Sequence, residues 1–277
     1  MVKNSYRLPV VEGTFYQSDP VKLTQQFDTF FSNAPKVTIT GKILGMVVPH
    51  AGYIYSGFTA SVAYNMLRGN EIKDVVIISP SHREYFKAVT IFDGLGYSTL
   101  FGNIDINQNI KEELLKYDLI KESTRGHGAE HALEIQLPFL QKVLKNNFNI
   151  LPLVMGDQNV GTCLMLGEIL SKVFENKSDY LIIASSDLSH FYSSAKAKIK
   201  DDVMINGINN FDIDGIIEDL ESKNTEACGG GPILSMMMAT KKLGANSSKV
   251  LHYSHSGEVT GDHNEVVGYL SAIVWKE

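Results

Sequence analysis

The sequence predicts a single α/β domain over residues 1–277, with a mostly parallel central sheet and helices on both faces. Two observations support this fold class. Short apolar runs of strand length alternate with longer helical patterns, as expected of parallel strands joined by crossover helices. No internal repeat, low-complexity segment or linker rich in Pro and Ser divides the chain, and 277 residues are compatible with one large domain.

Four continuous apolar runs have the length and composition of strands that are buried on both faces. They cover residues 43–48, 74–79, 150–155 and 180–185. A β-rich region near the C-terminus predicts further strands at 250–254 and 266–274. Because parallel strands need helical crossovers, the intervals between the runs should contain helices.

Helical patterns do occupy these intervals. They cover residues 57–67, 130–144, 161–174, 194–208 and 232–243. Pro138 predicts a kink or a break in the second pattern, because proline cannot donate a backbone hydrogen bond inside a helix. Pro232 lies at an early position of the last pattern, where proline is tolerated.

The composition argues against several classes of protein. Hydrophobic residues make up 44% of the chain and charged residues 20%, as in an ordinary folded domain. The net charge is −6 and no stripe of Lys or Arg occurs, which argues against a nucleic-acid surface. The chain has two cysteines, no apolar leader at its start and no apolar run long enough to cross a bilayer. We therefore expect a cytoplasmic protein without a membrane or nucleic-acid partner.

Polar side chains follow three of the predicted strands. His50 follows the run 43–48, His82 follows the run 74–79, and Asp187 and His190 follow the run 180–185. In open α/β sheets the functional crevice lies beyond the carboxyl ends of the strands, so these side chains should share one edge. One strand-end histidine is usually a hydrogen-bonded loop residue, but three such strand ends predict a metal or acid/base site.

Cys228 is a further candidate ligand. It precedes three glycines and Pro232, which should begin a helix. The positive end of a helix favours a thiolate, and thiolate binds iron, copper or zinc. The alternative is a buried free cysteine, which is the interpretation we prefer for Cys163 inside an apolar helix.

A second polar cluster lies at the start of the predicted helix 130–144. Glu130 and His131 in its first turn should point into the crevice, as substrate contacts or as supports for a ligand. The alternative is a charge cluster favoured by the helix dipole. Tyr53 and Tyr55 could line the same pocket. The histidine-rich stretch 252–263 is expected to form a surface loop, and His252 and His255 would be a poor chelating pair, because they would lie on opposite faces of a strand.

Five segments together resemble the Memo family, which includes the AmmeMemoRadiSam system protein B. They are VVPHAGYIYSG at 47–57, SPSH at 79–82, GAEHALEIQLPFLQ at 128–141, SSDLSHF at 185–191 and ACGGGPI at 227–233. The resemblance implies a fold similar to class III extradiol dioxygenases, which hold Fe(II) with two histidines and a carboxylate. It also implies possible radical SAM and AMMECR-type protein partners.

The resemblance implies that His50, His82 and Cys228 are the metal ligands. It places Asp187 and His190 in the same pocket, where His190 matches the dioxygenase acid/base histidine in approximate role. Cysteine here takes the place of the carboxylate. Thiolate is softer and more easily oxidised, so copper or zinc become alternatives to Fe(II), and the ring-cleaving reaction cannot be transferred from the fold.

Three functional hypotheses follow from this site. The first is a metal-dependent redox protein with one bound ion, acting on a small molecule. The second is a binding module in which the pocket holds a phosphorylated or carboxylated peptide, with Arg83 and Arg125 as candidate anion contacts. The third is a zinc hydrolase in which Asp187 or Glu130 acts as the base.

Overall fold

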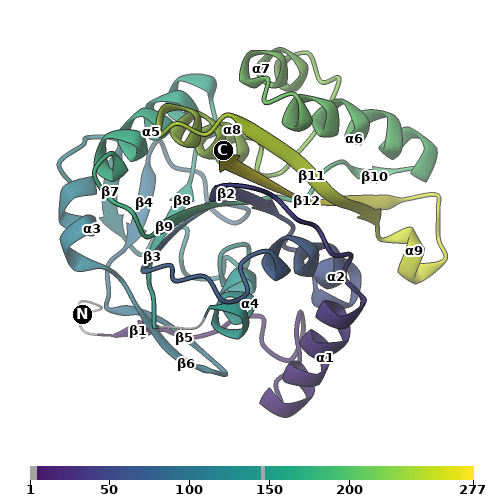
Figure 1. The fold of residues 1–277 in the computed structure, drawn as a ribbon, viewed down its shortest axis with the longest axis horizontal. Coiled ribbons are helices and arrows are strands. Elements are labelled where there is room, and N and C mark those ends of the chain that lie inside the picture. The colour runs from purple at the N-terminus through teal and green to yellow at the C-terminus, as the bar shows by residue number, and fades with distance from the viewer. Residues whose placement is uncertain (1–4, 145–146) are drawn as a thin grey trace.

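A nine-stranded mixed sheet forms the centre of the computed structural model, which describes residues 5–144 and 147–277 (Figure 1). Four parallel strands make up the middle of the sheet, and their spatial order is β2, β9, β3 and β8. Their bounds are Lys42–Val48, Tyr180–Ser185, Asp74–Pro80 and Asn149–Met155. These are the four apolar runs of the sequence, and the predicted α/β fold class is confirmed.

Strands on both sides of this centre make the sheet mixed. The C-terminal strand β12 (Val266–Lys276) pairs antiparallel with β2, and it also pairs antiparallel with β11 (Ser247–His255) and β10 (His190–Tyr192). On the other side, β4 (Val89–Phe92) is antiparallel to β8 and parallel to β7 (Ile120–Ser123). A separate small sheet contains β1, β5 and β6, at Tyr6–Arg7, Gly96–Thr99 and Gly102–Asp105.

Helices cover both faces of the large sheet, as Figure 1 shows. One face is covered by α1, α2 and α4, which span Pro20–Asn33, Tyr53–Asn65 and Leu137–Val143. The other face is covered by α3, α5, α6, α7 and α8, which span Gln108–Leu114, Val160–Phe174, Ser194–Asn209, Ile213–Glu221 and Gly230–Lys242. Alternate strand residues supply the two cores: Val47 packs on the second face, and Met46 and Val48 on the first.

The predicted helix 130–144 is wrong in its first half. Residues 130 and 131 have no regular secondary structure, 132 and 133 form a turn, a short 3₁₀ helix follows at Glu134–Gln136, and α4 begins only at Leu137. Pro138 therefore occupies the first turn of a helix, where its missing N–H has no consequence. The Glu130 carboxylate accepts the backbone N–H groups of His131 and Ala132, which gives the turn an alternative to helical hydrogen bonding.

Two further expectations differ from the structure. Helix α2 begins at Tyr53, four residues before the predicted start at residue 57. The stretch 252–263 is not one surface loop: β11 extends through His255, and the short helix α9 follows at Gly257–Thr260. His252 is half-buried, and its Nδ1 lies 3.0 Å from the Thr59 hydroxyl. Within the described residues, no helix is long and apolar enough to cross a membrane.

Candidate metal centre

Three imidazoles meet beyond the carboxyl ends of β2 and β3. His50 follows β2, His82 follows β3, and His131 lies in the irregular segment before the 3₁₀ helix and α4. Among the described residues, these three side chains form a group whose potential ligand atoms all lie within 4.8 Å of one another. The ring centroid of His50 is 5.1 Å from that of His82 and 5.5 Å from that of His131. Such a group is suited to holding a metal ion.

The Cys228 sulfur lies next to this group, on the side of His50. Its Sγ is 3.2 Å from His50 Nε2. Backbone contacts hold the cysteine at the end of β9: the Cys228 N–H donates to the Asp187 carbonyl at 3.2 Å, and the Asp187 N–H points at the sulfur at 3.2 Å. The structure thus groups His50 and His82 with His131 and places the Cys228 sulfur against His50, so the ligand set of His50, His82 and Cys228 stays a prediction.

Burial favours the uncharged forms of His50 and Cys228. Burial lowers the pKa of His50 well below its ordinary value, and the neighbouring imidazoles of His82, His131 and His190 lower it further. Burial also raises the pKa of Cys228 above its ordinary value, and Asp187 adds to this effect. The expectation that a helix end favours the Cys228 thiolate is therefore wrong for the chain without an ion. Helix α8 begins two residues later at Gly230, and burial dominates.

This donor set fits a metal ion. Neutral imidazole is the form that binds metal. The positive charge of a bound cation would stabilise the thiolate form of Cys228. The outer nitrogen of His82 is already engaged, because its Nδ1 lies 3.0 Å from a Glu130 carboxylate oxygen. A carboxylate on the outer nitrogen of a metal-binding histidine is a common arrangement, and it leaves Nε2 for the ion.

Glu130 supports two of the three imidazoles. Its carboxylate accepts the backbone N–H of His82 at 2.6 Å and that of His131 at 2.9 Å, and it lies 3.3 Å from His131 Nδ1. Burial alone would raise the pKa of Glu130, but the hydrogen bonds from His82 and the backbone outweigh it and lower the pKa to about 2. Glu130 is thus a buried carboxylate anion that hydrogen bonds hold next to the imidazoles of His82 and His131.

Asp187 and His190 lie at the same end of the sheet. The Asp187 carboxylate is buried and accepts the backbone N–H of His50 at 2.7 Å, so it holds the residue that carries a candidate ligand. Burial raises the pKa of Asp187 to about 7. His190 begins β10 and lines a cleft together with Cys228 and Glu226, and burial lowers its pKa.

Tyr53 does not lie as expected, whereas the place of Tyr55 beside the pocket stays a prediction. Tyr53 is buried in the aromatic core, where its hydroxyl donates to the Ile135 carbonyl at 2.7 Å and its ring centroid is 4.9 Å from that of Phe139. It does not line the site, because the early start of α2 turns it toward the core. Tyr55 is 40% exposed on the same helix.

Two other groups near the predicted crevice have structural partners. Glu134 does not face the imidazoles, because it forms a buried ion pair with Arg7 and accepts the Tyr16 hydroxyl at 2.9 Å. The guanidinium of Arg125 donates to the Tyr85 carbonyl at 3.0 Å and lies over the Phe86 ring. Arg125 is thus already engaged within the chain, which weakens the case for it as an anion contact.

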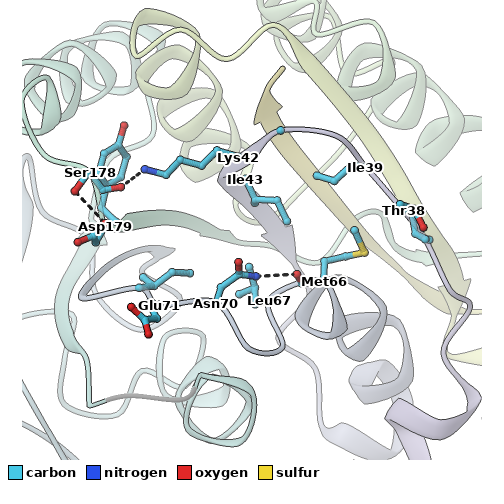
Figure 2. A pocket seen from close by; sticks show the side chains of 14 residues that line it. Thr38, Ile39, Lys42, Ile43, Met66, Leu67, Asn70, Glu71, Ser178 and Asp179 are labelled. Atoms are coloured by element: carbon cyan, nitrogen blue, oxygen red, sulfur yellow. Dashed lines mark hydrogen bonds between the residues drawn. The ribbon is translucent and has the colours of Figure 1, made fainter.

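A separate cavity lies at the opposite end of the parallel strands, as Figure 2 shows. It is lined by residues that include Lys42 at the start of β2 and Tyr180 at the start of β9, together with Met66 and Asp179. The Lys42 ammonium donates to the Ser178 carbonyl at its edge. The cavity contains none of the predicted site residues, so it is distinct from the imidazole cluster.

Comparison with known proteins settles the family. Residues 7–273 match the family model described as "Memo-like protein". The chain belongs to the Memo family. It is similar to MEMO1 family proteins of Thermoplasma volcanium (38% identity over 98% of this chain and 99% of the relative) and Aquifex aeolicus (35% identity over 96% and 98%). The resemblance inferred from the five sequence segments is confirmed.

A solved structure supports the fold of this Memo-family chain. The crystal structure of an uncharacterized protein from Escherichia coli K12 superposes with a TM-score of 0.54, at 10% sequence identity. The match covers 84% of this chain and all of the other. At such low identity the likeness concerns the architecture only, and it carries nothing about chemistry.

Sequence reasoning missed two buried residues of the Memo-family site. Ser185 Oγ lies 2.9 Å from His50 Nδ1, and the Gln136 side-chain amide lies 2.8 Å from the same hydroxyl. Both belong to segments that carry the family resemblance, SSDLSHF and GAEHALEIQLPFLQ. A serine at the end of an apolar strand and a glutamine in an apolar helix give no chemical signal by themselves, so only the folded arrangement identifies them.

Proposed function

We propose that this Memo-family chain binds one metal ion through His50, His82 and Cys228 and uses it in redox chemistry on a small molecule. The observation that carries the proposal is the meeting of donors: three imidazoles whose ligand atoms lie within 4.8 Å of one another, with a thiol 3.2 Å from His50 Nε2. In a tetrahedral site with metal–nitrogen and metal–sulfur bonds of about 2.1 and 2.3 Å, the two ligand atoms would lie about 3.6 Å apart, so a small outward shift of the thiol or the imidazole would admit the ion.

The ligand chemistry supports a redox-active ion. Thiolate and imidazole together suit iron, copper and zinc, and we propose Fe(II) as the resident ion, with copper or zinc as alternatives. A bound iron or copper ion would supply one-electron chemistry. His131 completes the set of imidazoles as a neighbouring donor or a substrate contact. His190, in the cleft beside Cys228, is the group we assign to hold or accept a substrate proton.

Anaerobic oxidation of the Fe(II)-loaded protein tests the redox role. Ferricyanide, a one-electron oxidant, is expected to oxidise about one iron per chain, with a new visible absorption from thiolate bound to Fe(III). The Cys228→Ser variant should lose this absorption. The matched control is Cys163→Ser, which removes the other cysteine, buried in α5, and should leave the spectrum unchanged. Absorption that survives in Cys228→Ser, or iron that resists oxidation, would contradict the proposal.

The pH dependence of metal binding should report the cysteine proton. The pKa of His50 is lowered and that of Cys228 is raised, so near pH 7 the imidazole is already neutral while the thiol still carries its proton. Binding must release the thiol proton, and between pH 7.5 and 9, above the pKa of about 7 of the neighbouring Asp187, the affinity for Zn²⁺ should therefore rise about tenfold per pH unit. Competition with a chromophoric chelator measures this slope. A flat profile in wild type, or an equal slope in Cys228→Ser, would contradict a thiolate ligand.

A further inference from the structure

We infer that Ser185 is a positioning residue that fixes His50 as the tautomer with its proton on Nδ1, so that the Nε2 lone pair faces the site. The inference deepens the proposed function, and its consequence for metal affinity rests on that function. The tautomer itself concerns the metal-free chain and can be judged without any ion.

The Ser185 hydroxyl is saturated by three neighbours. Ser185 is the last residue of β9 and is buried. Its Oγ lies 2.9 Å from His50 Nδ1, 2.7 Å from the Ala132 carbonyl oxygen and 2.8 Å from Gln136 Nε2. A serine hydroxyl has one proton to donate and two lone pairs that accept. The three contacts can therefore all be hydrogen bonds only if Ser185 donates one and accepts two.

Two backbone carbonyls fix the direction of each bond, because a carbonyl oxygen can only accept. The Ala132 carbonyl takes the single proton of Ser185. The Pro49 carbonyl lies 3.0 Å from Gln136 Nε2, so the amide nitrogen of Gln136 must face that side. The amide oxygen then accepts the Tyr64 hydroxyl at 2.8 Å, and the second amide hydrogen donates to Ser185.

His50 is left with one option. Ser185 has no further proton to give, so His50 Nδ1 must donate to the remaining lone pair of the hydroxyl. A neutral imidazole carries one ring proton, and its place on Nδ1 leaves Nε2 as the acceptor. That nitrogen is the one 3.2 Å from the Cys228 sulfur. The chain from Tyr64 through Gln136 and Ser185 thus prepares the metal-facing atom of His50 before any ion arrives.

His82 is oriented by a carboxylate instead of a hydroxyl. Its Nδ1 contacts the anionic Glu130 carboxylate, whereas His50 Nδ1 contacts a neutral hydroxyl. The neutral chain brings no further negative charge to the buried face of His50, where the Asp187 carboxylate already contacts its backbone. The removal of Ser185 should consequently change the tautomer and orientation of one imidazole while the charge of the site stays the same.

Nitrogen NMR of the metal-free protein tests the inference directly. Long-range ¹⁵N–¹H spectra of the full chain, labelled at its eight histidines and treated with chelator, distinguish the two tautomers, and the signals absent from His50→Gln assign His50. We expect a protonated Nδ1 in wild type and in Ser185→Thr, which keeps the hydroxyl. We expect a mixed or reversed tautomer in Ser185→Ala. A protonated Nε2 in wild type overturns the inference, even if the protein binds metal.

A Zn²⁺ titration separates this inference from the proposed function. Ser185→Ala should bind Zn²⁺ about 10–100-fold more weakly than wild type, as found when the supporting residue of a ligand is removed. Ser271→Ala is the matched control, since Ser271 is a buried strand serine of β12 whose hydroxyl has no hydrogen-bond partner among the described residues.

The outcomes of the two experiments are distinguishable. Wild type that binds no Zn²⁺ defeats the proposed function, while the NMR result still decides the tautomer. A Ser185→Ala variant that keeps both the wild-type tautomer and the wild-type affinity overturns the inference. If Ser185→Ala does not fold, the spectra of wild type and Ser185→Thr decide alone.

Discussion

Replacement of His50 by alanine is expected to lower the affinity for Zn²⁺ or Fe(II) by more than about 100-fold, beyond the range of about 10–100-fold that supporting residues show. His50 has the largest expected effect because the other donors gather around it. Its ring centroid lies 5.1 Å from that of His82 and 5.5 Å from that of His131, and its Nε2 lies 3.2 Å from the Cys228 sulfur. Its removal leaves the remaining donors without their shared neighbour.

The matched control for this prediction is His252→Ala. His252 is another histidine whose pKa burial lowers, but it is only half-buried, lies on β11 and contacts the Thr59 hydroxyl instead of the cluster. Its removal should leave metal affinity unchanged. Anaerobic competition titrations measure both variants, and thermal unfolding of the metal-free proteins shows whether each is folded. Equal losses in the two variants would mean that the cluster around His50 is not the site.

The second large effect concerns stability. Arg7→Met is expected to lower the free energy of unfolding by about 3–5 kcal/mol, because it leaves a buried carboxylate without its cation. The Arg7 side chain is 6% exposed and that of Glu134 is fully buried. Glu134 also accepts the backbone N–H groups of Val10 and Val11, at 2.8 and 3.1 Å, so it cannot turn out to solvent easily.

This ion pair also supports the candidate metal centre. The Arg7 guanidinium donates to the carbonyl of His127 at 2.9 Å and to that of Glu130, whose carboxylate holds His82 and His131. Urea unfolding measures the loss of stability. Lys73→Met is the control, because Lys73 forms an exposed ion pair with Asp179 and such pairs contribute about 0–1 kcal/mol. A loss in Arg7→Met no larger than in this control would show that the buried pair is not a major support of the fold.

The central fold and two of the converging residues were readable from the sequence for a simple physical reason. Parallel strands buried on both faces are continuous apolar runs, and their carboxyl ends meet at one edge. His50 and His82 follow two such runs directly. The position of the C-terminal strand beside β2 was not readable, because the partner of an antiparallel strand depends on contacts between residues far apart in the chain.

The details of the site depend on local competition that periodicity does not show. His131 was expected on a helix, but Glu130 binds the backbone N–H groups that follow it, and the chain turns so that His131 joins the imidazoles. Cys228 was expected as a thiolate at a helix end, but burial raises its pKa. Ser185 and Gln136 were not recognised, because their role lies in hydrogen bonds that join separate segments.

The most direct test of the central claim is the metal content of the full chain purified without air, combined with X-ray absorption at the edge of the bound metal. The account predicts about one iron, copper or zinc ion per chain, with one sulfur neighbour at about 2.3 Å and nitrogen neighbours at about 2.1 Å. A protein that takes up no metal, or a bound ion surrounded by nitrogen and oxygen alone, would contradict it.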